Sequence, residues 1–355
     1  MKKLLFVLLL IFSMTSISWF NKNICHAENL VLYNGEVHHL FTHCLIAHPD
    51  IAFDENNFMK NHLNNDCITP NEFKNILNQL HKNNYVLVDI NSIFETDQNE
   101  NVVKKKLYLP KNKKPLVFSF DDVVYDSKKQ GKGMVDKIIV DESGNLATIT
   151  KQNNKEIISY DNEFITILES FTKKHPDFSF NGAKGTICLT GYDGILGYRT
   201  SERNKTNRED EIQKVKPVIQ KLKQNGWNFA CHSFGHYHMK KISEKKFEEE
   251  LKLWNEQVTP LIGKTQVYVY PYGEWEVFDD GNLSKKHTML KQNGFKLFCG
   301  VGMKPFFSYL PTSSNEKVLF MDRTCVDGYT LLNKQEYLQK YFDCKSVYDK
   351  HSRKN

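Results

Sequence analysis

From residue 30 onward, short β-rich runs alternate with amphipathic helical stretches, and this alternation constrains the fold more than any other feature. It is the pattern of βα units arranged around a parallel sheet. The strand count and the alternation predict a distorted (β/α) barrel of about seven to eight strands rather than an open doubly wound sheet. The predicted strands cover residues 37–42, 85–90, 116–120, 186–190, 228–231, 266–270, 296–299 and 318–321.

The helices between these strands carry their own start signals. Thr69 can cap a helix, Pro70 can take its first position, and Glu72 can complete a capping box. Residues 136–152 differ, because two β-rich runs flank a turn-forming stretch and therefore predict an inserted β-hairpin. Further helices are predicted over residues 161–174, 210–224, 243–258 and 284–292.

Residues 1–27 have the pattern of an export signal. Two lysines precede an apolar run over residues 4–12, and the segment ends in Ala27, a small residue suited to cleavage. We expect secretion or association with the cell wall, with residues 28–355 forming one domain that has an N-terminal strand and helix extension. A membrane anchor is the weaker alternative, because the apolar run is shorter than the roughly 20 residues that span a bilayer.

The charge and the cysteines exclude several classes of site. The net charge of +6 comes mainly from scattered lysines, and basic and aromatic residues do not interleave along one element, so nucleic acid is not expected as a partner. Attraction to an anionic cell wall stays open. The cysteines beyond the leader are odd in number and lack CxxC spacing, which fits neither a disulfide framework nor a cysteine zinc site. One bridge, Cys44–Cys67 or Cys325–Cys344, stays open.

The strongest chemical signal is a buried-type strand over residues 116–120 that ends in Asp121 and Asp122. In a βα barrel, the carboxyl ends of the strands form the functional face. Adjacent side chains at a strand end point in different directions. One carboxylate can therefore bind a metal ion while the other faces a substrate.

Two later strand ends carry further chemistry. The strand over residues 228–231 runs into HSFGH, which places His232 and His236 at i and i+4. Two such imidazoles can bind one ion if the segment turns helically after the strand. The strand over residues 266–270 runs into PYGEW, a tight turn that presents two large aromatic faces of the kind that stack against sugar rings.

The combination of FSFDD at residues 118–122, HSFGH at 232–236 and YPYG at 270–273 resembles the polysaccharide deacetylases of carbohydrate esterase family 4. The resemblance covers roughly residues 37–332, and GYDGILGYRT at 191–200 is similar to a clostridial-type secreted branch. It implies a hydrolase that removes acetyl groups from N-acetylglucosamine-type residues of a cell-wall or extracellular polysaccharide. The alternatives are an O-acetyl glycan esterase and a catalytically weak carbohydrate-binding relative.

The resemblance also implies a role for each motif residue. Asp121 is expected to be the general base. Asp122, His232 and His236 are expected to bind a divalent ion, most simply zinc, with cobalt or nickel as alternatives, since imidazole ligands argue against calcium. The residues expected to bind substrate are Pro271, Tyr272, Gly273, Trp275, Arg199 and Arg323.

One departure from the family pattern concerns an arginine. Many members of the family carry an Arg two positions before the Pro-Tyr-Gly turn, where it orients the catalytic Asp. Here that position holds Val269, and Arg199 or Arg323 could take its place in space.

The second departure concerns the general acid, because the late Leu-x-His motif is missing and only His287 and His351 follow the turn. We predict His43 as the acid, since it closes the first predicted strand and barrel strand ends share one face. An imidazolium can give a proton to a leaving amine near pH 7. This arrangement resembles biofilm poly-N-acetylglucosamine deacetylases, in which an early strand-end His serves the active site. A purely structural His43 is the alternative.

Overall fold

The computed structural model describes residues 30–152, 155–275, 278–279, 282–302, 307–309 and 318–353. The predicted export signal, residues 1–27, lies outside these ranges. Among the described helices, none combines the length and the apolar character that a membrane span requires.

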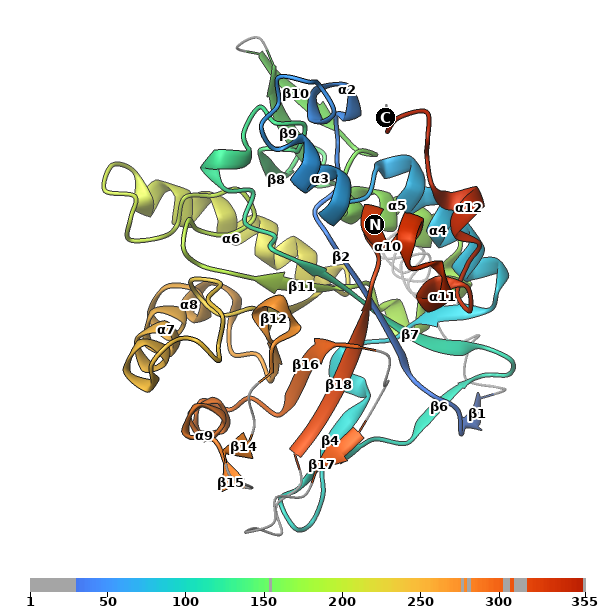
Figure 1. Ribbon diagram of the computed structural model, residues 1–355, viewed down its shortest axis with the longest axis vertical. Coiled ribbons are helices and arrows are strands. Elements are labelled where there is room, and N and C mark those ends of the chain that lie inside the picture. Colours follow the sequence, from blue (N-terminus) through green and yellow to red (C-terminus); the bar gives the residue numbers. More distant parts are fainter. Residues whose placement is uncertain are drawn as a thin grey trace, which may run out of the picture.

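Seven parallel strands of the described chain close into a barrel (Figure 1). Around the ring, β7 pairs with β2 on one side and with β11 on the other, and the order β2-β7-β11-β12-β13-β16-β18 returns to β2. The predicted barrel is therefore confirmed. Its strands are β2 (His38–His43), β7 (Lys114–Asp121), β11 (Thr186–Leu189), β12 (Asn228–Cys231), β13 (Val267–Val269), β16 (Leu297–Val301) and β18 (Val318–Cys325).

The predicted strand over residues 85–90 forms but lies outside the ring. It is shortened to β3 (Tyr85–Leu87), which pairs with the first residues of β7, whereas β11 pairs with Ser119 and Phe120 near the end of β7. Both strands use the same edge of β7 at different heights, so only one can continue the barrel. The remaining strands are β1 (Leu30–Tyr33), β4 (Phe94–Thr96), β5 (Val102–Lys104), β6 (Leu107–Pro110), β14 (Phe278–Asp279), β15 (Asn282–Leu283) and β17 (Phe307–Tyr309).

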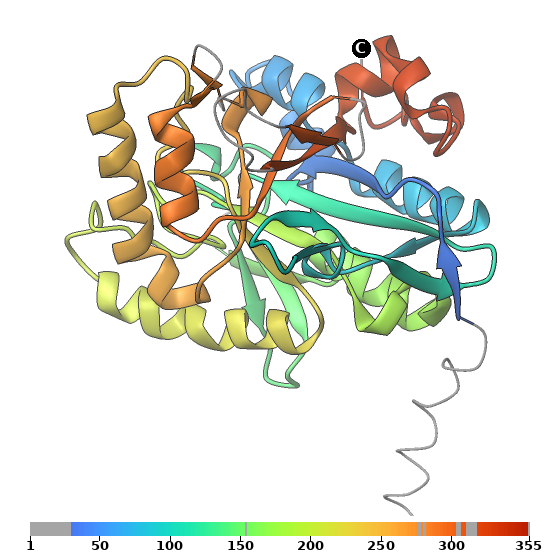
Figure 2. The same ribbon diagram turned by 90° about the horizontal axis from the view of Figure 1, so that it is seen from below.

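The main helices cover the outside of the barrel (Figure 2). The capping box is present: Thr69 Oγ1 accepts from the Glu72 amide at 3.2 Å, and the Glu72 carboxylate accepts from the Thr69 amide at 2.8 Å. The longer helices are α4 (Pro70–Lys82), α5 (Phe164–Lys174), α6 (Arg208–Gln224), α7 (Glu244–Gln257) and α9 (Lys285–Gln292). The short ones are α2 (Pro49–Ala52), α3 (Lys60–Asp66), α8 (Thr259–Ile262), α10 (Gly328–Asn333), α11 (Gln335–Leu338) and α12 (Cys344–Val347).

The alternation of side chains along each strand decides which residues face the barrel interior. On β7, Leu116, Phe118 and Phe120 pack in the cluster beneath the helices, and Val117 packs with inward-facing residues of the other strands. Ser119 and Asp121 share the face of Val117. The same period makes polar side chains at the ends of several strands converge at one end of the barrel.

The predicted hairpin is confirmed and gains a third strand. β8 (Lys137–Val140) pairs with β9 (Leu146–Gln152), and β10 (Lys155–Ser159) adds to the other edge of β9, all antiparallel. The seven cysteines of the described chain are all free, so neither of the two bridges that the sequence left open is formed.

Candidate active site

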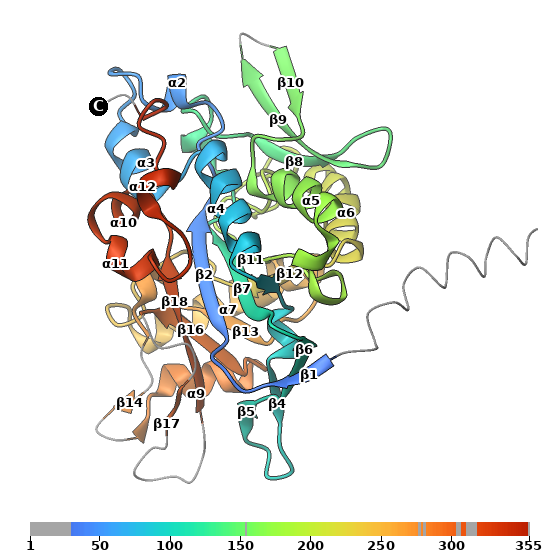
Figure 3. The same ribbon diagram turned by 90° about the vertical axis from the view of Figure 1, so that its right-hand side faces the viewer.

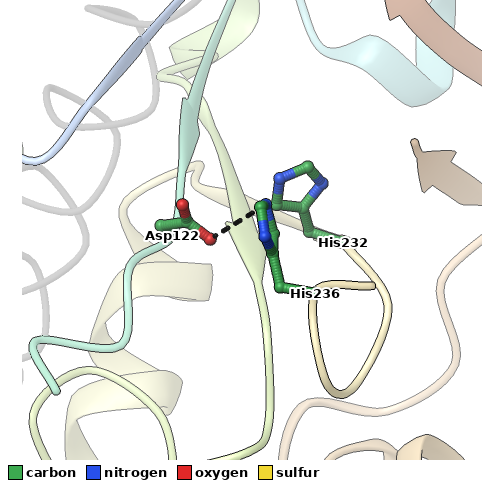
Figure 4. Close-up of side chains that lie close together, drawn as sticks. All are labelled: Asp122, His232 and His236. Carbon is green, nitrogen blue, oxygen red and sulfur yellow. Dashed lines mark ion pairs between the residues drawn. The ribbon is translucent and has the colours of Figure 1, made fainter. Parts of the chain in front are cut away.

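The carboxyl ends of β2, β7 and β12 bring the predicted chemistry together. Asp121 ends β7 and is the register partner of His43, which ends β2. His232 follows β12 directly. Figure 4 shows that Asp122 faces the two histidines across the mouth of the barrel. Residues that lie far apart in the sequence thus form one cluster.

Asp122, His232 and His236 form a group that could hold one metal ion. Each offers one ligand atom, and these three atoms lie within 4.8 Å of one another. His236 Nε2 is 3.7 Å from Asp122 Oδ1 (Figure 4). His232 is buried, while the other two side chains are partly open. The spacing and the donor types match a two-histidine, one-carboxylate site for a transition metal.

Hydrogen bonds and charge keep these donor atoms unprotonated, as metal binding requires. His232 Nδ1 lies 2.9 Å from the Val269 carbonyl, which can only accept, so Nδ1 carries the proton and Nε2 keeps its lone pair. Burial lowers the pKa of His236 to about 4, so this imidazole is neutral. Burial acts to raise the pKa of Asp122, but the His236 and His232 imidazoles outweigh it and lower the pKa.

The backbone that carries the site is strained. Asp122, Ser233, His236 and Tyr272 have φ of 56°, 57°, 55° and 59°. Side chains other than glycine rarely adopt this left-handed region, and such residues cluster at functional sites. The two histidines are therefore brought together through left-handed residues, without the helical turn that the sequence analysis had made a condition. Ser233 Oγ holds the turn by accepting from the His236 amide at 2.9 Å.

Asp121 is a buried carboxylate paired with Arg323. The Arg323 Nη1 group donates to Asp121 Oδ1 at 2.7 Å and lies 3.3 Å from Ser119 Oγ. The other carboxylate oxygen, Oδ2, is 3.7 Å from His232 Nε2. Burial acts to raise the pKa of Asp121, but the Arg323 guanidinium and His232 outweigh it, so this carboxyl stays ionised.

Arg323 thus supplies, from β18, the guanidinium that the family motif would place at Val269. It is only 1% exposed, and its Nε also donates to the Gly300 carbonyl at 3.2 Å. The expectation that Arg323 binds substrate does not fit this burial, because a side chain inside the barrel cannot reach a polysaccharide. Arg199 does not take this place, since its guanidinium donates to the Tyr125 carbonyl at 2.6 Å and pairs with Asp193 at 3.4 Å.

The predicted aromatic turn contributes one open ring. Tyr272 is 55% exposed, and its ring stacks on His238 with centroids 3.8 Å apart. Pro271 is buried, and Gly273, at φ 65°, lies where a Cβ would press against Val301. Trp275 is half-buried against Phe320, with ring centroids 5.3 Å apart, so most of this ring supports the core.

His43 is partly buried, and one of its two ring nitrogens is held by a hydrogen bond. Its Nδ1 lies 2.8 Å from the carbonyl oxygen of Asp66, so Nδ1 carries a proton and Nε2 is the nitrogen free to exchange one. The register of β2 and β7 places His43 beside Asp121. The rival histidines bond elsewhere: His38 with Tyr341, His39 with Ser119, and His48 with Thr150 and Gln152.

The sequence reading missed several residues at the site. His238 stacks on Tyr272, and its Nδ1 lies 2.9 Å from Glu274 Oε2. Lys129 lies in the loop after β7, where burial acts to lower its pKa but the Asp122 charge outweighs burial and raises it. The closely spaced histidines of HSFGHYH could have indicated His238. Nothing in the local sequence marks Lys129.

Residues 151–295 match the family model described as polysaccharide deacetylase. Over these residues the chain is similar to the polysaccharide deacetylase family. The matched segment includes His232, His236 and the Tyr272 turn, and it begins after Asp121 and Asp122. Membership of a clostridial-type branch stays a prediction.

Solved structures of deacetylases are similar to this chain over most of its length. The Streptococcus pyogenes deacetylase PplD in complex with acetate is 14% identical, with 84% of this chain and 97% of that chain covered and a TM-score of 0.44. A putative polysaccharide deacetylase from Bacillus anthracis is 14% identical, with 87% and 69% covered and a TM-score of 0.46. A search of curated proteins gave no match.

Behind the site, Glu163 ties the segment after β2 to helix α5. Its buried carboxylate accepts from the Leu45 amide at 3.1 Å and from the Phe164 amide at 2.8 Å. Burial raises the pKa of Glu163 to about 8, so the folded protein holds this proton at neutral pH. Since an unfolded Glu has a pKa of about 4.3, the stability that comes from this group is full below that pH and is lost as pH rises through about 8.

We therefore expect Glu163→Gln, which is neutral at every pH, to weaken the fall in stability between pH 5 and pH 9. The free energy of unfolding, measured by urea denaturation across this range, should increase for the variant relative to wild type as pH rises, because only wild type loses stability from this group. Glu142→Gln, at an exposed position, is the control and should keep the wild-type slope. A Glu163→Gln difference that is constant with pH would contradict a protonated buried Glu163.

Proposed function

We propose that this protein is a metal-dependent deacetylase that removes acetyl groups from N-acetylglucosamine-type residues of a cell-wall or extracellular polysaccharide. The observation that carries the proposal is the clustering of three metal-type donor atoms within 4.8 Å, beside the buried, arginine-paired carboxylate of Asp121. The leader over residues 1–27 supports export to the compartment in which such polysaccharides lie.

Asp122, His232 and His236 would hold the ion, and we propose zinc, with cobalt or nickel as alternatives. Two imidazoles and one carboxylate suit these ions and do not suit calcium. When bound, such an ion polarises the acetyl carbonyl and lowers the pKa of water. The chain's own contribution is to keep the donor atoms unprotonated and the His232 ring fixed by the Val269 carbonyl.

Asp121 is the proposed general base. Arg323 occupies its Oδ1 and leaves Oδ2 directed toward His232, so Oδ2 is the oxygen that can take a proton from the attacking water. Proton transfer by a positioned carboxylate typically contributes roughly a hundred- to ten-thousandfold in rate. Arg323 fixes the carboxylate and keeps it ionised before the attack.

His43 is the proposed general acid, and Tyr272 the proposed sugar contact. His43 Nδ1 is held by the Asp66 carbonyl, so Nε2 would give a proton to the amine as the carbon–nitrogen bond breaks. The exposed Tyr272 ring lies beside His236, with centroids 4.6 Å apart, where it can pack against the sugar whose acetyl group enters the site.

Two alternatives keep the same residues. An O-acetyl esterase would use the same ion and base on an ester. A binding protein without turnover was favoured by the missing motif Arg and late His, but Arg323 and His43 supply a guanidinium and an imidazole at the site. A protein that only binds has no use for an ionised carboxylate held inside the barrel, so the enzyme is the better reading.

Acetate release distinguishes these functions. We expect the purified protein to release acetate from chitooligosaccharide or peptidoglycan, and to stop when a chelator removes the ion. Release from acetylated xylan alone would identify an O-acetyl esterase. Binding of the glycans with no acetate from any of them, with zinc restored, would leave only the binding function.

The two aspartates should separate in their effects. Asp121→Asn should keep the metal and lose at least about a hundredfold in kcat, because an amide cannot accept the proton. Asp122→Asn should instead lower metal occupancy, as should His232→Ala, which leaves two protein ligands. Metal analysis and acetate release on the same samples check both. Equal metal loss in the two Asn variants would contradict the division of roles.

His43→Asn should impair only a reaction that needs a protonated leaving group. We expect a loss of about a hundredfold or more in kcat on chitooligosaccharide, together with loss of the alkaline limb of its pH profile. Hydrolysis of 4-nitrophenyl acetate should stay near wild type, because nitrophenolate leaves without a proton. An unchanged profile with near-normal kcat on the amide would remove His43 from the mechanism.

A further inference from the structure

The carbonyl group that holds His43 lies in a segment clamped by a distant arginine. Arg353 is 1% exposed, and its Nη1 donates to the Asn64 carbonyl at 2.7 Å and to Asn64 Oδ1 at 2.9 Å. Its Nη2 donates to the Cys67 carbonyl at 2.7 Å. Asp66 lies between these two anchored residues. One guanidinium therefore fixes the backbone on both sides of the carbonyl that accepts from His43.

The remaining donors of Arg353 bind Glu72 at the start of α4. Its Nε donates to Glu72 Oε1 at 2.7 Å and its Nη2 to Oε2 at 2.8 Å. Glu72 also closes the capping box through the Thr69 amide. A guanidinium has five N–H donors, and the contacts with Asn64, Cys67 and Glu72 use all of them. A lysine, with three donors on one nitrogen, cannot make this set of contacts.

The C-terminal helices also pack closely against the same segment, between Asn64 and Cys67. Gly328 begins α10, and a Cβ at this position would overlap the Asn64 carbonyl oxygen and lie 2.5 Å from Arg353 Nη1. In Figure 3, α10 and α12 lie against α3 and α4. The C-terminal helices thus cover the outer side of the segment whose Asp66 carbonyl orients His43.

We propose that Arg353 is a positioning residue for the deacetylation reaction: by fixing the carbonyl of Asp66, it sets the direction in which His43 presents Nε2. The proposal rests on the proposed function, in which His43 is the acid. Arg353 itself is buried and touches no substrate. Its contacts with Asn64 and Cys67 hold the carbonyl in place, and the imidazole follows the carbonyl through the 2.8 Å hydrogen bond.

The test compares a substrate that needs the acid with one that does not. Arg353→Lys should lower kcat on chitooligosaccharide by about tenfold or more, within the range that a general acid contributes. It should leave 4-nitrophenyl acetate hydrolysis and metal content near wild type. In a His43→Asn background, Arg353→Lys should add no further loss on the amide, because residues that act as a unit are not additive.

A second variant and a control guard against a simple folding defect. Gly328→Ala places a Cβ against both the Asn64 carbonyl and the Arg353 guanidinium. It disturbs the same contacts without changing Arg353 itself, and it should likewise lower activity on the amide but not on the activated ester. Leu80→Ala removes a buried side chain two turns further along α4. It should lower the melting temperature and leave the ratio of the two activities near wild type.

The outcomes separate the two proposals. Arg353 is only structural if His43→Asn lowers activity on the amide alone while Arg353→Lys and Gly328→Ala lower activity on both substrates in proportion. An additive double variant would also overturn the positioning role. If His43→Asn shows no such difference between the substrates, the acid role fails first and the positioning role falls with it. Both proposals are supported if all three variants lose activity on the amide but keep it on the activated ester, and if the double variant is non-additive.

Discussion

A buried ion pair joins Arg323 of β18 to Asp121 at the end of β7, and the arrangement of the active site depends on it. Both side chains are almost fully buried, and the Nη1–Oδ1 distance is 2.7 Å. Removing one partner of such a pair typically destabilises a protein by roughly 3–5 kcal/mol, because the other charge is left buried and unpaired. The pair also links β18 to β7 across β2, the strand that lies between them. One contact therefore ties neighbouring strands together and keeps Asp121 ionised and oriented.

The left-handed residues of the site follow from the way in which the strand ends are occupied. Inward-facing positions at the strand ends are already taken by Asp121, His43 and Arg323, so the metal-type ligands must come from the residues that follow the strands. Asp122 and His236 reach one point only because their backbones turn through left-handed φ, at 56° and 55°. Such residues cost of order 1–3 kcal/mol each when they are not glycine, and the surrounding barrel must hold them.

Local sequence patterns predicted the elements and the motifs of this chain well. The predicted strand 228–231 matches β12 residue for residue, and the Thr69–Glu72 capping box is present, because both depend on neighbours in the sequence. The placement of β3 could not be predicted, since two strands compete for one edge of β7. The sequence offered both Arg199 and Arg323 in place of the motif arginine and could not choose between them. It also could not show that Arg323 is buried, because burial is a property of the closed barrel. Nothing in the sequence around Arg353 predicted its role, because its partners lie near residue 70, far away along the chain.

The two buried arginines act on the two proposed proton-transfer groups in different ways, and the chemistry explains why. A base that must stay ionised benefits from a guanidinium in direct contact, which Arg323 provides to Asp121. An acid must carry a positive charge before it gives its proton away, and a bare guanidinium beside an imidazole would disfavour that charge. Arg353 instead acts through the neutral carbonyl of Asp66, and its own charge is paired with Glu72 at 2.7 Å. The structure can thus orient His43 through a neutral group while the charge of Arg353 is paired elsewhere.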